Sequence, residues 1–289
     1  IEYLRFEEEM PSEQFNIYNN ELADIERLKG NSDNVNPVLQ GLFNLRSISD
    51  HPYLKNYQIE NISTNKLIAV SAKLKKVISL LNDIKSASEK AIIFTENKSM
   101  QRVLRKIISE YYDIVPSIIN GETPSSKSKS SRTKLSRQQE IDKYQEKNGF
   151  NVIVMSPLAA GFGLNITEAN HVIHYTRHWN PAKEQQATDR AYRIGQQKPV
   201  KVYYPMAIAP NKDFKTFDSV LDDLLRRKSN LASSTLFPTE QIEISKSDFL
   251  NALTIADEIT TVQLLSIDDV DNLQHNLFEA AIAVLVEKI

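Results

Sequence analysis

Apolar residues follow two periodicities along this 289-residue chain. Short runs rich in β-branched residues, each ending in polar residues, predict buried strands. These runs cover residues 90–96, 115–121, 151–156, 171–175 and 200–207. Apolar stripes with a spacing near 3.6 residues predict helices between the strands, the clearest of them from Ala72 to Ile84. Strands that alternate with helices indicate an open α/β fold, in which helices cover both faces of a parallel sheet.

Further helical segments are predicted before and after this sheet. Leu39, Leu42 and Leu45 share one helical face in a segment that stops before Pro52. A strongly amphipathic helix begins at Phe217, and the tail of the chain has the pattern of a last helix, which reaches the final residue without a capping glycine or asparagine. We therefore expect this sequence to be a piece of a longer protein.

Composition excludes several classes of protein. The absence of cysteine excludes disulfide scaffolds, thiolate zinc and iron–sulfur sites, and cysteine nucleophiles. No stretch approaches the roughly 18 uninterrupted apolar residues of a membrane span, so we expect no membrane partner. The net charge of −2 gives no global indication of a nucleic-acid partner, so any polyanion site must be a local patch. Segment 123–138 is the most basic, and its serine content predicts a solvated loop.

Two glycines follow the strand predicted to end at Ser156. Gly161 and Gly163 lack a Cβ atom, so the backbone there can approach a phosphate or a ribose closely. The histidines at 171, 174 and 178 are spaced like metal ligands. His171 and His174 point to opposite faces of a strand, however, so we expect no metal site.

Arginines are closely spaced further along the chain. Arg190 and Arg193 are three residues apart, and Gln186 lies four before Arg190, so a continuous helix would present all three on one face. Two guanidinium groups and an amide suit a phosphate chain. A surface helix whose arginines pair with carboxylates such as Asp189 fits the same spacing.

These segments together resemble a known family. The block from 154 to 204 contains WNP, then QATDRAYRIGQ, then KPV, and resembles motifs V and VI of the Swi/Snf-type superfamily-two helicase-like ATPases. LQGLFNLRSISDHPYL (39–54) resembles the family's segment between two RecA-like lobes, and SAKLKKVISLLNDI (71–84) with KAIIFTE resembles the start of the second lobe. IINGETP (118–124) resembles a conserved turn of that lobe. The similarity covers roughly residues 10–235.

The resemblance implies a domain organisation. Residues 1–58 would be a helical segment that joins a missing first lobe, and 59–210 would be the second RecA-like lobe. Residues 211–235 would form a brace helix, and 236–289 a helical tail that could begin a further domain. The end of that tail, FEAAIAVLVEKI, also resembles the opening helix of Mrr-type nuclease domains. An ordinary amphipathic packing helix fits the same pattern.

The resemblance also implies an ATP-driven translocase on double-stranded DNA, in which ATP and Mg²⁺ bind between two lobes and the first lobe holds the Mg²⁺. Arg190 and Arg193 would be arginine fingers, helped by Gln186. Gly161 would shape motif V, and Gly163 would lie against the ribose.

Contacts to the nucleic-acid backbone would come from residues at strand ends and from the helix after IINGETP. These residues are Thr95, Asn97, Gly121, Ser156 and Arg137. Hydroxyl and backbone N–H groups that bind phosphate do not read base sequence.

The chain departs from the family pattern mainly near these contacts. Pro157 and Leu158 replace a usual Thr-Arg or Thr-Lys pair, and Ala160 replaces a glycine. Asn170, Thr176 and His178 stand where acids are usual. These departures weaken the predicted DNA contacts more than the predicted arginine fingers.

No G-x-x-x-x-G-K-[ST] motif occurs, so we expect this piece alone to be inactive as an ATPase. Two alternatives stay open: a non-catalytic RecA-like binding module, and an RNA helicase lobe. The expected location is the cytoplasm of a prokaryote, in association with the nucleoid.

Overall fold

The computed structural model of the chain describes residues 1–29, 35–55, 59–125, 135–161 and 164–234. Three of the predictions fall on residues outside these ranges: Gly163, most of the basic segment 123–138, and the helical tail over 236–289.

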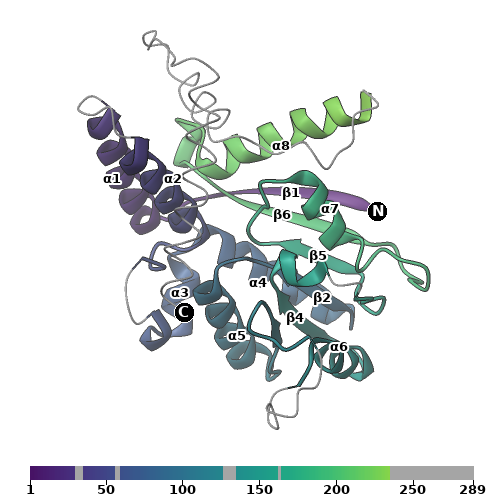
Figure 1. The fold of residues 1–289 in the computed structure, drawn as a ribbon. Coiled ribbons are helices and arrows are strands. Elements are labelled where there is room, and N and C mark those ends of the chain that lie inside the picture. The colour runs from purple at the N-terminus through teal and green to yellow at the C-terminus, as the bar shows by residue number, and fades with distance from the viewer. Residues whose placement is uncertain (30–34, 56–58, 126–134, 162–163, 235–289) are drawn as a thin grey trace. The chain divides into compact units, whose positions relative to one another are not determined.

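A parallel sheet of six strands organises the described residues (Figure 1). Its strands are β1 (Glu2–Glu9), β2 (Lys90–Phe94), β3 (Ser117–Ile119), β4 (Asn151–Met155), β5 (His171–His174) and β6 (Lys201–Ile208). They are ordered β1-β6-β5-β2-β4-β3, and every neighbouring pair is parallel. This order confirms the predicted parallel α/β fold, including all five strands predicted from the apolar runs.

Strand β1 corrects one prediction, because residues 2–9 lie in the segment expected to be helical. It pairs with β6 over its whole length, from Glu2 opposite Lys201 to Glu9 opposite Ile208. Along this edge strand, half-buried residues such as Leu4 and Phe6 alternate with exposed ones. That period of two is the pattern of a strand buried on one face only.

Helices follow the strands in the sequence. They are α1 (Ser12–Lys29), α2 (Val35–Asp50), α3 (Thr64–Ala69), α4 (Ala72–Ser86), α5 (Lys98–Tyr112), α6 (Arg137–Glu146), α7 (Pro181–Thr188) and α8 (Phe217–Ser234), with short 3₁₀ helices η1 (Ile59–Asn61), η2 (Pro157–Gly161) and η3 (Pro210–Lys212). Polar side chains cap several of them. Asn97 accepts a hydrogen bond from the amide of Met100 at the start of α5, and Ser136 with Gln139 forms a capping box on α6.

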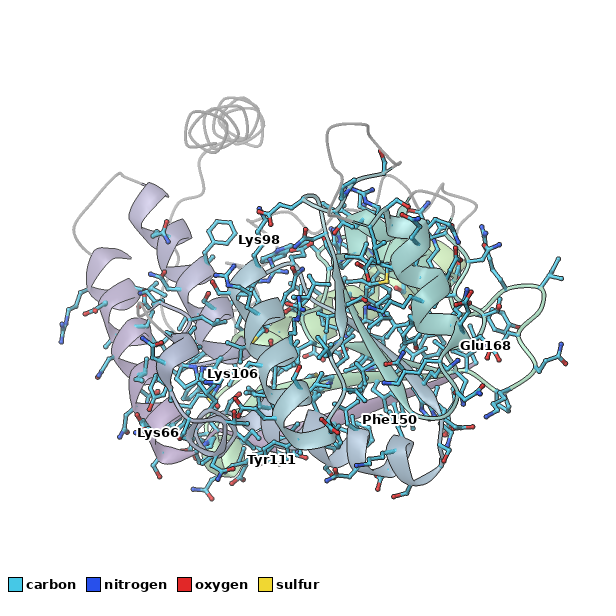
Figure 2. The ribbon with its side chains drawn as sticks, turned by 90° about the horizontal axis from the view of Figure 1, so that it is seen from below. Lys66, Lys98, Lys106, Tyr111, Phe150 and Glu168 are labelled. Atoms are coloured by element: carbon cyan, nitrogen blue, oxygen red, sulfur yellow. The ribbon has the colours of Figure 1, made fainter. Side chains whose placement is uncertain are left out.

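Helices cover both faces of the sheet, as predicted. Ala91 and Ile93 of β2 point toward α4 and α5, whereas Ile92 and Phe94 point toward α6 and α7. All four side chains are fully buried. Figure 2 shows the side chains that fill the space between the sheet and these helices. The alternation of side chains along a strand explains why the short apolar runs are buried on both faces.

A third apolar cluster joins α1, α2 and α8 beside the sheet. Leu45 and Ile48 of α2 pack there with Tyr18 of α1 and with Phe217 at the start of α8. The backbone amide of Phe217 donates a hydrogen bond of 2.8 Å to the Tyr18 hydroxyl. Helix α8 lies within the segment predicted as a brace helix, and α2 ends at Asp50, next to the predicted stop.

Candidate nucleotide and nucleic-acid site

Helix α7 leads into the turns that carry the two predicted arginine fingers. Asn180 caps its start by accepting hydrogen bonds from the amides of Ala182 and Lys183. The helix ends at Thr188, so the prediction that Arg190 and Arg193 leave one helical face is wrong. In a longer helix the carbonyl of Arg190 would accept from residue 194, but it accepts from the amide of Ile166 at 2.9 Å. Tertiary contact with the loop after η2 therefore ends the helix.

The environment of Arg190 differs from that of Arg193. Arg190 is buried, at 5% exposure, and its Nε has no hydrogen-bond partner among the described residues. Arg193 is exposed, and its Nη1 donates to Asn165 Oδ1. Burial lowers the pKa of the Arg190 guanidinium, and the nearby charge of Arg193 lowers it further. The Arg190 guanidinium stays charged at neutral pH, because an arginine is effectively always protonated.

The alternative of arginines paired with Asp189 does not fit this arrangement. Asp189 accepts a hydrogen bond of 2.8 Å from Gln185 instead. In the part of the chain that the structure describes, no carboxylate is hydrogen-bonded to either guanidinium group. Gln186 is exposed on α7, two residues before the end of the helix. Two adjacent cations without a bonded carboxylate suit an anionic ligand with several charges, such as a polyphosphate.

The turn after β4 forms η2, which ends at Gly161. The amide of Ser156 donates to the carbonyl of Ile119 at 2.8 Å, and its carbonyl accepts from Ala159 at 3.0 Å. Pro157 is buried, whereas Leu158 is 58% exposed. An apolar side chain therefore faces solvent at the position where the family usually has a cation.

Residues predicted to contact nucleic acid gather at the carboxyl ends of β2, β4 and β3, which are neighbours in the sheet. Ser156 and Asn97 are half-buried, and Gly121 is exposed. Thr95 is different, because it is fully buried and its hydroxyl lies 3.0 Å from that of Thr176. The structure thus does not present the Thr95 hydroxyl to a ligand.

Arg137 heads α6 as predicted, but its side chain points into the protein. Its Nε donates to the carbonyl of Thr123 at 3.0 Å, and its Nη2 lies 3.4 Å from the carbonyl of Asn120. Arg137 is 8% exposed. These contacts hold the turn that contains Gly121, so Arg137 positions a predicted contact and is not itself turned toward solvent.

A hollow of about 450 Å³ lies between α5 and this turn. Three cations of α5 line it, Lys98, Arg102 and Arg105, together with Glu140 of α6 and with Glu122, which lies 2.7 Å from Lys98 Nζ. The three cations were not among the residues predicted from the sequence. Their spacing of three and four residues places them on one face of α5, and only that periodicity could have indicated them.

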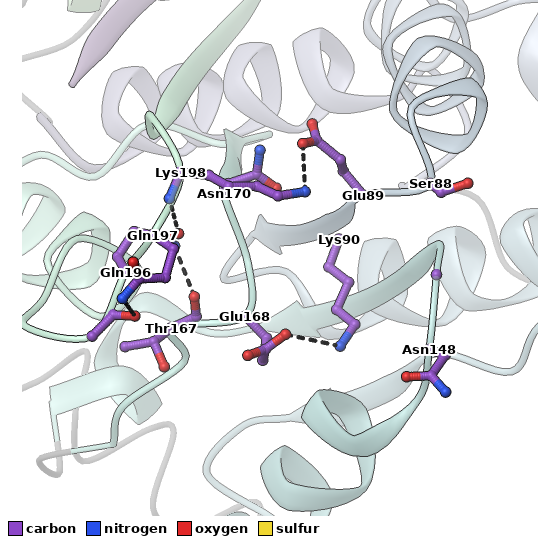
Figure 3. A pocket seen from close by; sticks show the side chains of 12 residues that line it. Ser88, Glu89, Lys90, Asn148, Thr167, Glu168, Asn170, Gln196, Gln197 and Lys198 are labelled. Atoms are coloured by element: carbon purple, nitrogen blue, oxygen red, sulfur yellow. Dashed lines mark hydrogen bonds and ion pairs between the residues drawn. The ribbon is translucent and has the colours of Figure 1, made fainter.

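A second hollow, of about 190 Å³, lies near the amino ends of strands β2, β5 and β6 (Figure 3). Its charges are paired with one another. Glu89 lies 2.6 Å from His171 Nε2 and 2.8 Å from Lys198 Nζ, and Lys90 lies 3.5 Å from Glu168. Burial raises the pKa of Glu89, but hydrogen bonds from Lys198, Asn170 and His171 outweigh it and lower that pKa to about 2. This hollow therefore offers no unpaired charge for a ligand.

Neither a metal cluster nor a membrane-spanning helix is found in the described ranges. No three His, Asp or Glu side chains gather there as a ligand set, and none of the helices described is both long and apolar enough to cross a bilayer. His171 and His174 lie on opposite faces of β5, as predicted, because His171 stacks on Tyr203 and His174 on Tyr204.

Comparison with known proteins identifies this arrangement. Residues 72–195 match the family described as helicase conserved C-terminal domain. The SWI2/SNF2 ATPase core of Sulfolobus solfataricus, solved in complex with dsDNA, superposes with a TM-score of 0.66 at 26% identity, over 90% of this chain and 50% of that one. The chain is a Swi2/Snf2-type C-terminal lobe.

Two curated relatives support this assignment of the Swi2/Snf2-type lobe. The Zorya protein ZorD of Escherichia coli O139:H28 is 47% identical over 180 residues, which are 62% of this chain and 16% of that protein. YwqA of Bacillus subtilis is 37% identical over 196 residues, or 67% of this chain and 19% of its own length. The Swi2/Snf2-type lobe thus spans less than a fifth of these relatives. Its family consists of helicase-like ATPases.

Proposed function

We propose that this Swi2/Snf2-type lobe is the second half of an ATP-driven translocase that moves on double-stranded DNA. The observation that carries the proposal is the pair Arg190 and Arg193, two adjacent guanidinium groups to which no carboxylate is bonded in the described structure. ATP would bind between this lobe and a first lobe, which would supply the P-loop and hold the Mg²⁺.

The arginine pair would act on the transition state of hydrolysis. Guanidinium donors that are already in place stabilise the charge that spreads over the γ-phosphoryl oxygens in the transition state. An arginine that acts in this way typically raises the rate of hydrolysis by a factor of about 10³–10⁵. Arg190 is held by burial, and its buried Nε has no hydrogen-bond partner among the described residues. Arg193 is exposed and bonded only to a neutral amide, which a phosphate oxygen could replace. Gln186 and the two glycines would help to shape the site.

The proposed DNA contacts lie at the carboxyl ends of strands β2, β4 and β3. Asn97, Gly121 and Ser156 would bind phosphates through backbone and side-chain groups, and the cations of α5 would add charge. Thr95 and Arg137 would act indirectly, by holding these segments. One comparison favours DNA, because the similar Sulfolobus core was solved with dsDNA. The relative YwqA is named as an ATP-dependent helicase/translocase, which favours a motor without indicating its nucleic acid.

The rival function is a non-catalytic RecA-like module that binds a partner. Pro157 and the exposed Leu158 favour it, because they replace polar groups at an expected DNA contact. The retained Gln186, Arg190 and Arg193 favour the motor. An RNA helicase lobe is the third candidate, and the ligand preference in the following experiment separates it from a DNA motor.

The test uses the full-length protein that contains this chain. ATPase activity is measured alone and with duplex DNA, single strands and RNA, for the wild type, Arg190→Ala and Arg193→Ala. Stimulation by duplex DNA that falls at least a hundredfold in both variants is the expected result. Stimulation by no nucleic acid supports the binding module, and stimulation by RNA alone supports the RNA helicase. The 289-residue piece by itself should show no ATPase activity.

A further inference from the structure

Four side chains of alternating charge form a row through the interior of the lobe. Arg5 of β1, Asp222 of α8, Arg177 after β5 and Glu184 of α7 follow one another in this order, and we refer to them as the charge ladder. Arg5 Nε lies 3.1 Å from Asp222 Oδ2. Arg177 bonds to Asp222 through Nη1 and to Glu184 through Nη2 at 2.7 Å and Nε at 2.8 Å.

The ladder is buried apart from its outer end. The side chains of Arg177, Asp222 and Glu184 are 5–7% exposed, and that of Arg5 is 37% exposed. Two positive and two negative charges balance, and the Arg177 guanidinium also lies 3.9 Å from the centre of the Tyr204 ring. Buried ions are tolerated only with good geometry and full pairing, which a planar guanidinium between two carboxylates provides.

The inner end of the ladder fixes helix α7. Glu184 lies two residues before Gln186 and six before Arg190, and it also accepts a hydrogen bond of 3.0 Å from the amide of His178. At the other end of α7, Thr188 bonds to His174 Nε2 at 2.8 Å. The short helix is thus held against the sheet at both ends, immediately before the turn that carries Arg190.

The outer end of the ladder lies on two other elements, β1 and α8, and the Tyr3 hydroxyl of β1 also donates a hydrogen bond of 3.0 Å to Gln185 of α7. Asp222 belongs to α8, whose first turn is packed against α1 and α2. Arg5 belongs to β1, which lies within segment 1–58, the segment expected to join the first lobe. Arg177 itself stands between Thr176 and His178, two positions at which this chain departs from the family pattern.

We propose that Arg177 is a positioning residue for Arg190, and that the charge ladder transmits displacements of β1 and α8 to the arginine pair. This inference rests on the proposed function. When β1 or α8 moves, Asp222 moves with it, and Arg177 and Glu184 follow because a bidentate pair resists bending. The orientation of α7, and with it the placement of Arg190, then depends on how the lobe is held by its neighbours.

The experiment compares conservative variants in the full-length protein. Asp222→Asn removes one charge and leaves Arg177 its pair with Glu184. Arg177→Lys keeps the charge but loses the fork that holds two carboxylates. Asp223→Asn is the matched control, because Asp223 is the next residue on α8 and its partner, Lys215 at 2.7 Å, is 54% exposed. Each variant is measured for kcat, for KM of ATP, and for affinity toward ADP with and without aluminium fluoride.

We expect kcat to fall roughly tenfold to a hundredfold in Asp222→Asn and Arg177→Lys, the usual effect of misplacing a catalytic group by about 1 Å. Affinity for ADP–aluminium fluoride, which imitates the transition state, should fall by a similar factor. KM for ATP and the affinity for ADP alone should not change in these two variants. The control, Asp223→Asn, should match the wild type in every measurement. Combining Asp222→Asn with Arg190→Ala should cost no more than Arg190→Ala alone, since both act through one group.

Other outcomes overturn the inference. Additive losses in the double variant, equal weakening of ADP and ADP–aluminium fluoride, or a full rate in Asp222→Asn would each show that the ladder only stabilises the fold. If Arg177→Lys does not fold, Asp222→Asn alone decides. Failure of the proposed function is recognised separately: Arg190→Ala would then leave the ATPase rate unchanged, whatever the ladder variants do.

Discussion

The ammonium group of Lys73 lies 2.9 Å from a carboxylate oxygen of Asp50, and both side chains are at most 3% exposed. A second carboxylate, Asp218, lies 2.9 Å from the same nitrogen. Asp50 ends α2, Lys73 lies in the first turn of α4, and Asp218 lies in the first turn of α8. One buried lysine thus joins three helices that are far apart in the sequence.

Replacing Lys73 should strongly destabilise the chain. Lys73→Met leaves two buried carboxylates facing each other without a cation, and breaking a buried ion pair in this way typically costs about 3–5 kcal/mol. Urea unfolding of the 289-residue chain measures the loss. Lys75→Met, on an exposed position of the same helix, should change stability by less than about 0.5 kcal/mol. Equal stability of the two variants would contradict this account.

Two buried histidines should make the lobe sensitive to acid. Burial lowers the pKa of both His51 and His174 to about 4, from an ordinary value of about 6.5. His51 is neutral by geometry as well, because its Nδ1 accepts from the amide of Tyr53 while its Nε2 donates to the carbonyl of Leu67. The folded state therefore binds fewer protons than the unfolded state. Stability is complete above about pH 6.5 and falls as the pH drops toward 4, by about 3 kcal/mol for each histidine.

The variant His174→Gln separates this effect from the titration of carboxylates. A glutamine amide can replace Nε2 in the bond to Thr188 but does not titrate. We expect the variant to be less stable than the wild type at pH 7.5 and to lose less stability between pH 7.5 and 4.5. Parallel stability curves for the two proteins would show that His174 does not contribute.

The close approach of α1 and α2 depends on Gly41. A Cβ atom at this position would lie 2.3 Å from Cγ1 of Ile25, well inside van der Waals contact. Gly41→Ala should therefore destabilise the chain by about 1–3 kcal/mol through overpacking, and adding Ile25→Ala should recover part of the loss. Gly121→Ala is the control, since an added Cβ there meets nothing within 4 Å. Thermal unfolding of the wild type, Gly41→Ala, the double variant with Ile25→Ala and Gly121→Ala measures these differences in stability.

The exposed Leu158 allows a test of the proposed DNA contacts by gain of function. Leu158→Lys introduces a cation at the carboxyl edge of the sheet, next to Ser156. If duplex DNA passes this edge, the full-length protein should bind it more tightly, and the slope of log K against log salt should steepen by about 0.9. Leu158→Gln controls for loss of the apolar side chain and should leave the slope unchanged. An unchanged slope in Leu158→Lys would place the DNA elsewhere.

The sequence was sufficient to predict the central sheet, because five of its strands are short apolar runs and four of these are buried on both faces. It did not predict β1, since an edge strand with the sequence EYLRFEEE has only a weak alternation and many acids. The end of α7 was missed for another reason: a bond from the Ile166 amide, 24 residues earlier, stops that helix. Local periodicity contains no information about such a contact.

The structure also explains one departure from the family pattern. The hydroxyl of Thr176 donates a hydrogen bond of 2.8 Å to Asp50 Oδ2. An acid at position 176 would set two carboxylates against each other in the interior. The threonine is therefore compatible with Asp50. The two residues are 126 positions apart, so the motif around Thr176 contains no information about this contact. The roles of Arg190, Arg193 and Gly163 stay predictions.

The pairing of β1 with β6 has a consequence for biosynthesis. The strand from Glu2 to Glu9 leaves the ribosome long before its partner, which begins at Lys201. At about 5–20 residues per second, the first strand waits roughly 10–40 s for the second. During that time its three consecutive glutamates, Glu7 to Glu9, keep the unpaired edge charged and discourage association with other nascent chains. The acidic residues that made this strand difficult to predict thus keep it from associating with other chains until β6 pairs with it.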